Sequence, residues 1–193
     1  MSEYTDAVRG FFENIDKTMQ NTADPHQRAI LENYLQHVTL EAGPRWREIF
    51  TTRPRLITDN PVYRINTFGH FEIYEGVEAV TRHYEEMQSS SLLMKDEELF
   101  VNNWGIASKA VITRFVSGAQ LQREGHSVAN ADGTYTQSFP VGMFWPYDEN
   151  AVLLGEDVYQ LEPHELVEID PAEALTLDER TAVAQPYLER YNR

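Results

Sequence analysis

Three side chains that can exchange protons lie in one short stretch, YLQHVTLEAG: Tyr34, His37 and Glu41. They are three and four residues apart, so in a helix they form one stripe. The neighbouring stripe is apolar and is typical of a helix that faces a core; it consists of Leu31, Leu35 and Val38. His37 and Glu41 therefore indicate either an acid–base pair, in which the carboxylate fixes the tautomer of the imidazole, or an exposed pair of small energetic value.

A second candidate base lies in the segment IASKAVITRFV, whose alternation is typical of a strand. Lys109 shares one face with Val111 and Phe115, while Arg114 points to the other face. Partial desolvation would lower the pKa of Lys109 and make it a base, or a partner for an oxyanion, at neutral pH. The alternative is a lysine that lies along the sheet and extends its ammonium group into water.

Two pairs of adjacent residues must point to opposite faces of their strands. Because Tyr63 and Arg64 adjoin, at most one of them enters a pocket, where a phenol would donate a proton to a leaving hydroxyl; the alternative is a core tyrosine. In LLGEDVYQLE, Asp157 and Tyr159 share one face and Glu156 takes the other. If both faces are covered, one carboxylate points inward and becomes a candidate acid, and Asp157 is the expected one.

Metal and nucleotide chemistry are not expected. The chain has no cysteine, and its histidines and carboxylates form neither HExxH nor a carboxylate-rich loop. The glycine-rich nucleotide motifs and the GxSxG elbow are also missing from the sequence. The chemistry expected is proton transfer without a cofactor and without a metal.

The elements that must position these residues change in character along the chain. Helical spacing and caps predict helices over residues 5–21, 25–42 and 76–88, with a short one in PRWREIF. A hairpin turning at Phe68 and Gly69 lies between them, and four long strands follow up to about residue 162, interrupted by an exposed excursion at 119–133. Helices followed by strands favour an α+β domain, with a curved antiparallel sheet wrapped over the N-terminal helices.

The composition fits one globular domain. The 193 residues include 41% apolar and 11% aromatic side chains, so we expect a single domain over residues 1–193, with a C-terminal helical arm at about 163–193 that packs rather than catalyses. The net charge of -15 opposes binding to nucleic acid and to anionic membranes, and no apolar run is long enough to span a bilayer. With an acidic start and no cysteine, we expect a cytoplasmic protein.

This order of elements resembles the nuclear transport factor 2 superfamily, in its SnoaL-like and scytalone-dehydratase-like branch. The segments that carry the likeness are WREIFTTRPRLITDNPVYR, GVEAVTRHYEEM and WGIASKAVITRFV. The resemblance implies a cone that encloses an apolar pocket, with a carboxylate from the second helix and a tyrosine at the start of the first strand; Glu41 and Tyr63 match these positions. The two strand histidines of the dehydratases are absent, and Lys109 is the nearest ionisable substitute.

Within that superfamily the chain looks most like lyases that convert lignin-derived diarylpropane diols into a stilbene and formaldehyde. The acid would be Tyr63 or Asp157, and the base would be the His37 and Glu41 pair or Lys109. The expected substrate contacts are Tyr34, Arg64, His83, Arg114, Trp145 and Tyr159. The alternatives are a dehydratase, a ketosteroid-type isomerase, or a ligand-binding or dimerisation module that is not an enzyme. The partners expected are a small aromatic substrate and further copies of the chain, as a homodimer or higher homo-oligomer.

Overall fold

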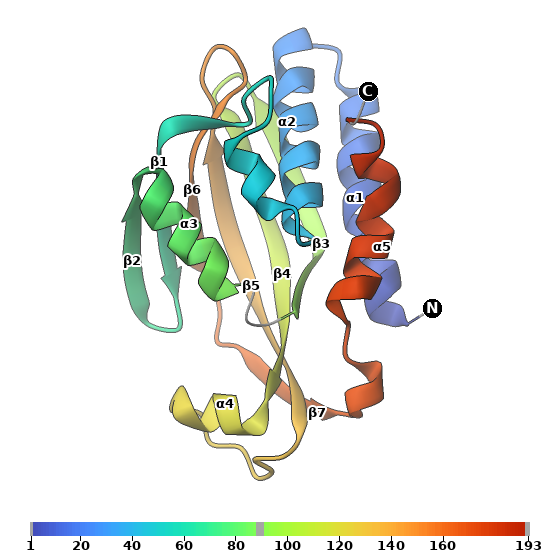
Figure 1. Cartoon of the computed structure of the whole chain (residues 1–193), viewed down its shortest axis with the longest axis vertical. Helices are drawn as coiled ribbons and strands as arrows, with labels where there is room; N and C mark the ends of the chain where they lie inside the picture. Colours follow the sequence, from blue (N-terminus) through green and yellow to red (C-terminus); the bar gives the residue numbers. More distant parts are fainter. Residues whose placement is uncertain (1, 88–90, 192–193) are drawn as a thin grey trace.

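The structure is a computed structural model that describes residues 2–87 and 91–191 (Figure 1). Its helices are α1 (Glu3–Asn21), α2 (Pro25–Glu41), α3 (Gly76–Met87), α4 (Gly118–Arg123) and α5 (Leu177–Leu188), with short 3-10 turns η1 (Trp46–Phe50) and η2 (Pro171–Glu173). Its strands are β1 (Ile57–Thr67), β2 (His70–Glu75), β3 (Ser91–Asn102), β4 (Gly105–Ser117), β5 (Thr134–Pro146), β6 (Leu153–Gln160) and β7 (Glu165–Ile169). The predicted helices and hairpins are confirmed to within about five residues, the largest difference being at the start of β1, and the predicted end of α3 at residue 88 lies outside the described residues.

The ends of α2 follow from local chemistry. Asp24 is the N-cap, and its carboxylate accepts hydrogen bonds from the backbone N–H groups of His26 and Gln27, while Pro25 occupies the first helical position. Ala42 is the C-cap, so Glu41 is the last residue of the helix. The side chain of Glu41 is therefore presented at a fixed point beside the sheet.

The strands form one sheet in the order β2-β1-β6-β5-β4-β3, and β7 pairs with β5. All neighbours are antiparallel except β1 and β6, which are parallel, so the sheet is mixed rather than antiparallel throughout as expected. The two parallel strands approach closely at Gly155, where a Cβ atom would lie 1.9 Å from the carbonyl oxygen of Val62. Glycine at this position permits the pairing that places β6 in the middle of the sheet.

The helices cover different parts of the sheet. Figure 1 shows α1, α2 and α5 side by side, α3 across β1 and β2, and α4 with β7 at the lower end. The core lies between α2 and the sheet, where Ile30, Leu31, Leu35 and Ile106 are all fully buried. A cone results, closed by α1 and α2 and bordered at its lower end by α4.

Two segments differ from expectation in detail. The excursion at 119–133 is not exposed throughout, because it contributes the helix α4, whose Leu121 is fully buried against Val116 and Tyr135. The C-terminal arm does begin its helix after Thr176, which forms a capping box with Glu179. The arm also reaches the site described below, because β7 joins the sheet and α5 packs against α1 and α2.

Candidate active site

A central cavity of about 360 Å³ lies between the sheet and the helices α2, α3 and α4. Its apolar lining consists of Ile65, Met87, Leu92, Met94, Ile112, Phe139, Met143, Trp145 and Val158. Its polar and ionisable lining consists of Glu41, Thr67, His83, Glu86, Arg114, Gln120, Glu124 and Glu156. The register of β4 with β5 gives it two ends, because Ile106 pairs with Trp145 at one level and Arg114 pairs with Gln137 at the other. We name them the inner end, with Trp145, and the α4 end, with Arg114.

Two carboxyl groups meet at the inner end. Glu41 comes from the last residue of α2, and Glu156 comes from β6 at the level of Trp145, since the next residue, Asp157, pairs with Phe144. Burial raises the pKa of Glu41 to about 7, although the positive charge of Arg180 lowers it in part.

Burial also holds the pKa of Glu156 well above its ordinary value, and the negative charges of Glu41 and Asp157 raise it further. Glu156 therefore favours its protonated form, while Glu41, with a pKa of about 7, exchanges its proton near neutral pH. Two coupled carboxyls with these properties form an acid and a base at one wall of an apolar cavity.

A chain of hydrogen bonds stands beside the two carboxyls. His37 Nε2 lies 2.7 Å from the Tyr84 hydroxyl, which lies 3.2 Å from the hydroxyl of Tyr63. Burial lowers the pKa of His37 to about 3, so the imidazole is neutral at physiological pH. All three side chains are buried at or near zero exposure, and none of them is among the residues that line the central cavity. They support the inner end from behind.

The hydrogen bond between His37 and Glu41 that the sequence suggested as one alternative is not formed among the described residues. Of the two ring nitrogens of His37, Nε2 has a partner, which is the hydroxyl of Tyr84 on α3, and Nδ1 has none in the part of the chain that the structure describes. Both residues are on α2 as predicted, but the imidazole fills the space between α2 and α3, while the carboxylate sits where α2 ends. His37 therefore contacts the site through a phenol rather than through Glu41.

Tyr34 marks a third acid whose pKa is raised by burial, Glu97, away from the lining of the central cavity. Its hydroxyl donates to Glu97 Oε1 at 2.8 Å, and burial raises the pKa of Glu97 to about 7. The ring of Tyr34 packs edge-on against Trp145, with ring centroids 5.0 Å apart. Tyr34 thus supports the wall of the cavity, and it is not one of the lining residues that a substrate would touch.

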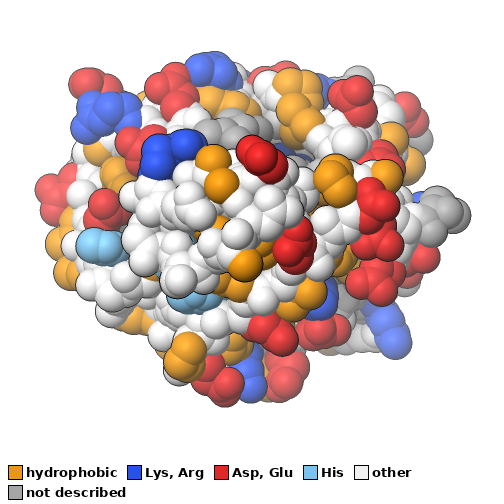
Figure 2. Space-filling model, turned by 90° about the horizontal axis from the view of Figure 1, so that it is seen from below, with side chains coloured by type: hydrophobic (Ala, Val, Ile, Leu, Met, Phe, Trp, Pro, Cys, Tyr) orange, Lys and Arg blue, Asp and Glu red, His pale blue; other side chains and the backbone are white. Residues whose placement is uncertain are grey.

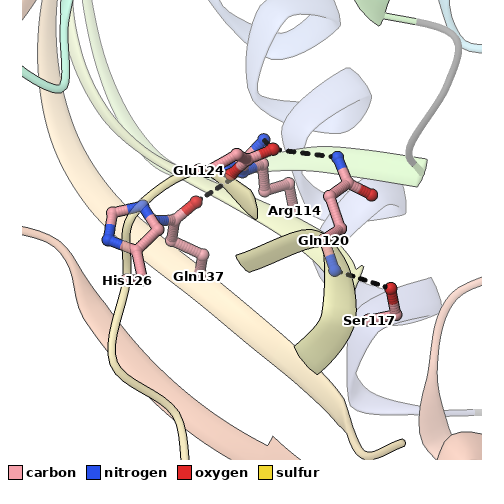
Figure 3. Close-up of polar contacts among 6 residues, drawn as sticks. All are labelled: Arg114, Ser117, Gln120, Glu124, His126 and Gln137. Atoms are coloured by element: carbon pink, nitrogen blue, oxygen red, sulfur yellow. Dashed lines mark hydrogen bonds and ion pairs between the residues drawn. The ribbon is translucent and has the colours of Figure 1, made fainter. Parts of the chain in front are cut away.

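The α4 end holds a compact polar network (Figure 3). Arg114 donates through Nε to Gln137 Oε1, and its Nη2 forms a very short ion pair with Glu124. Gln120 Nε2 also donates to Glu124, at 3.0 Å, and the amide of Gln137 contacts His126. Although burial raises the pKa of Glu124, the hydrogen bonds from Arg114 and Gln120 outweigh it and hold the pKa below its ordinary value. The charges at this end are paired and fixed.

Lys109 and Asp157 lie outside the site, which corrects two expectations. Lys109 is exposed, because β4 turns Ser108, Ala110 and Ile112 inward and not the opposite set. Asp157 is on the outer face of β6, where its carboxylate accepts a hydrogen bond from Arg64 at 3.0 Å. The alternation of both strands was predicted correctly, but the face assigned to the interior was wrong.

Arg64 and Tyr159 share that outer face and do not contact the cavity. Arg64 is occupied by its ion pair with Asp157, and the ring of Tyr159 lies 6.4 Å from that of Phe144, which is 43% exposed. The expected substrate contacts of these two residues are therefore not supported by their positions. The other face of β1 and β6 carries Ile65 and Val158 into the cavity.

Of the residues that the sequence singled out, four line the central cavity: Glu41, His83, Arg114 and Trp145. Burial lowers the pKa of His83 to about 4, so it is a neutral contact of the wall. Glu156 was weighed as the alternative to Asp157 and takes its place. Tyr84 and Arg180 were missed, because a tyrosine on a core-facing helix and an arginine in a distant acidic tail give no signal of their own in the sequence.

Two further observations concern clusters of metal-binding side chains and helices that could cross a membrane. Within residues 2–87 and 91–191, no group of three or more His, Asp or Glu side chains is placed to hold a metal ion. In these same ranges, no helix has the length and apolar character needed to cross a bilayer.

No protein-family model and no curated protein matches the chain. Among solved structures, it is similar to a protein of Xanthomonas campestris pv. campestris proposed to be a polyketide cyclase, with a TM-score of 0.51, 13% identity, and coverage of 82% of this chain and 98% of that one. A phenazine biosynthesis-related protein of Pseudomonas aeruginosa gives a TM-score of 0.48, 9% identity, and coverage of 78% and 85%. The first likeness confirms the predicted α+β fold class.

Proposed function

We propose that this α+β cone is an enzyme that carries out acid–base chemistry on a small organic molecule in its central cavity, without a cofactor. One observation carries the proposal: Glu41 and Glu156, from different elements, converge on the inner end of an apolar cavity, and burial raises the pKa of both. Desolvated carboxyls that form no salt bridge are costly, and their convergence on a cavity is typical of a catalytic acid and base.

The substrate class that we favour is a hydroxylated aromatic molecule. The wall contains Phe139, Trp145 and two methionines, and the volume of about 360 Å³ falls within the roughly 300–1,000 Å³ of small-molecule sites. Figure 2, seen from the α4 end, shows more acidic than basic side chains on this face, which favours a neutral over an anionic substrate. The description of the Xanthomonas protein as a polyketide cyclase is compatible with such chemistry.

More narrowly, we propose cleavage of a phenolic diarylpropane diol to a stilbene and formaldehyde. In the first step Glu156 gives its proton to the benzylic hydroxyl, the C–O bond breaks, and water leaves. Glu41 takes the phenolic proton, and the electron pair of the phenolate forms a quinone methide. The reaction consumes one proton from Glu156 and delivers one to Glu41, so no outside acid or base is needed.

In the second step the protons return. Ionised Glu156 takes the proton of the terminal hydroxyl, the terminal C–C bond breaks, and formaldehyde leaves. The electron pair forms the stilbene double bond and restores the aromatic ring, whose oxygen is reprotonated by Glu41. Both carboxyls end as they began, which suits a pair held at different pKa values.

A dehydratase or ketosteroid-type isomerase is the second candidate. The two phenols Tyr63 and Tyr84 favour it: burial raises their pKa values, and they lie near enough to Glu41 and Glu156 for those charges to raise them further. A small movement of either hydroxyl toward the cavity would stabilise an enolate oxygen. The two reactions differ in their products, since only the lyase releases formaldehyde.

The test is turnover of a panel of hydroxylated diarylpropanes, simple benzylic alcohols and ketosteroids, followed by formaldehyde release and ultraviolet absorption. We expect a stilbene chromophore and stoichiometric formaldehyde with the diarylpropane diol. Activity must be lost in Glu41→Gln and Glu156→Gln. Glu97→Gln is the matched control, because Glu97 is also buried but does not line the cavity. A purified, folded protein that turns over nothing on the panel would refute the lyase, and equal losses in all three variants would refute the assignment of the site.

We also propose that the protein works in the cytoplasm as a homo-oligomer. The absence of cysteine fits a reducing compartment. The outer face of the sheet exposes large apolar side chains, among them Phe100, Trp104 and Phe144. Light scattering on the wild type and on Phe144→Glu tests the assembly, and a monomer at working concentration in the wild type would contradict it.

A further inference from the structure

Arg180 is a buried arginine supplied by the C-terminal helix. It is 5% exposed, its Nε donates to the carbonyl oxygen of Ala42 at 2.7 Å, and its Nη1 donates to that of Leu92 at 2.8 Å. Ala42 is the C-cap of α2, and Leu92 belongs to the β3 wall of the central cavity. One guanidinium therefore ties together α5, the end of α2 and β3, directly beside Glu41.

Glu41 and Arg180 also face a second, small cavity. Its volume is about 50 Å³, which leaves room for a bridging water molecule. The remaining lining side chains are apolar: Val8, Phe11, Phe12, Val38, Ala42, Leu92, Leu93 and Met94. Among the described residues that line it, Glu41 and Arg180 are thus each other's polar counterparts.

We propose that Arg180 is a positioning residue for Glu41: it holds the end of α2 in place and keeps a positive charge against the carboxylate. This inference deepens the proposed function and rests on Glu41 as the base of that site. Because the guanidinium donates to two backbone carbonyls rather than to the carboxylate itself, Glu41 remains free to take up a proton. Without the cation, a smaller fraction of Glu41 would be ionised at neutral pH, and less of the protein would carry a base at this site.

The other groups around Glu41 work in the opposite direction or are neutral. Glu156, on β6, is an acid coupled to Glu41, and the phenols of Tyr63 and Tyr84 and the neutral imidazole of His83 carry no positive charge. Farther along the central cavity lie Glu86, Glu124 and Arg114, and the last two are paired with each other. Arg180 is therefore the cation whose charge acts on Glu41.

The test is a carboxyl titration that needs no substrate. Protein labelled with ¹³C at the glutamate carboxyls is titrated by NMR, and the Glu41 resonance is assigned by its disappearance in Glu41→Gln. In Arg180→Met we expect the midpoint of Glu41 to rise by about one pH unit, a tenfold increase in proton affinity, since loss of a nearby opposite charge has roughly this effect. Arg180→Lys keeps the charge and should keep most of the wild-type midpoint.

Arg190→Met is the matched control. Arg190 follows the same helix and anchors it to α1 through an ion pair with Asp16 at 2.9 Å, so its loss disturbs the docking of the arm without removing the charge beside Glu41. We expect an unchanged midpoint. A midpoint that coincides with the wild-type value in folded Arg180→Met, or one that moves equally in Arg190→Met, would overturn the inference.

A measurement on the wild type covers the case in which Arg180→Met does not fold. The Nε–H resonance of Arg180, hydrogen-bonded to Ala42, should shift with the titration of Glu41 and lose that shift in Glu41→Gln. A resonance that does not respond to this titration also overturns the inference. If the coupling is found and no molecule of the panel is turned over, the positioning role stands and the proposed reaction fails.

Discussion

The two ends of the central cavity differ in whether their carboxyl groups form salt bridges and in the direction of their pKa shifts. At the inner end, Glu41 and Glu156 take part in none of the salt bridges among the described residues, and burial raises both pKa values. At the α4 end, Glu124 is paired with Arg114, and its pKa is lowered. Both ends are lined by ionisable side chains, but the inner end holds Glu41, whose pKa of about 7 lets it change protonation near neutral pH.

The difference indicates where chemistry and where structure reside. A paired carboxylate is held in its charged form and in one geometry, so it fastens α4 to the sheet. Burying a carboxyl that forms no salt bridge costs desolvation free energy. Such a group is typical of sites where proton transfer uses its raised pKa. The comparison therefore separates a reactive end from a structural end within one cavity.

The largest expected effect is on turnover at the inner end. Glu41→Gln removes the group that accepts a proton, and we expect the rate to fall by about 10²–10⁴-fold, as is usual when a general base is lost. Arg114→Met, at the α4 end, should lower it less than tenfold, because the side chain is not close to the carboxyls. Steady-state rates on the panel substrate give both numbers, and similar losses at the two ends would contradict the distinction.

The next largest effect is on the free energy of unfolding at pH 8, which should rise when the glutamate is replaced at the inner end and fall when it is replaced at the α4 end. The folded-state pKa of Glu41 is about 7 and its ordinary value is 4.5, so the folded state holds the proton more tightly than the unfolded state between these values. Stability contributed by Glu41 therefore falls as the pH rises from about 4.5 to about 7. Glu41→Gln should be more stable than the wild type at pH 8, by up to roughly 3 kcal/mol, and this gain should vanish near pH 4.5.

Glu124→Gln should show the reverse. Its folded-state pKa lies below the ordinary value, so Glu124 adds stability above its unfolded pKa and loses it as the pH falls through the folded value. We expect this variant to be less stable than the wild type at pH 8. Urea denaturation at several pH values measures both differences, and the comparison with wild type cancels the opposite contribution of His37, which stays neutral in the folded state. The same sign in both variants would remove the contrast between the ends.

A smaller stability effect is expected from Arg114→Met. It leaves the carboxylate of Glu124 without its cation and the carbonyl of the fully buried Gln137 without a donor. The loss should be about 1–3 kcal/mol, the usual penalty of a buried partner left unsatisfied. Thermal unfolding of Arg114→Met measures it, and Arg64→Met is the control because its ion pair is more exposed.

The smallest effect is expected from Lys109→Met. The side chain is exposed and does not line the cavity, so stability should change by no more than about 0.5 kcal/mol, and turnover should be unaffected. Thermal unfolding and the panel assay measure these values. A loss of turnover comparable to that of Glu41→Gln would place Lys109 back in the reaction and sink the proposed site.

Of the two carboxyls at the inner end, the sequence pointed to Glu41 but did not favour Glu156 over its neighbour Asp157. Helical spacing placed Glu41 at the edge of an apolar stripe, which left an exposed flank and a pocket wall both open, and the family resemblance then assigned it to the pocket. Glu156 and Asp157 could not be separated, because alternation assigns residues to two faces without saying which face is covered. The helices that cover the sheet decide which carboxyl is inside. α2 and α3 lie over the face that carries Glu156, and Asp157 forms an ion pair with Arg64 on the opposite face.

By itself, the sequence determined the local elements: the capped start of α2 at Asp24 and Pro25, the hairpin at Phe68 and Gly69, and the helix that follows Thr176. These depend on contacts within a few residues. Only the tertiary structure decided which carboxyls face the cavity, that His37 bonds to Tyr84, and that Arg180 lies beside Glu41. Burial and pairing across the chain set the charge of each acid, and they exist only once the distant segments have packed together.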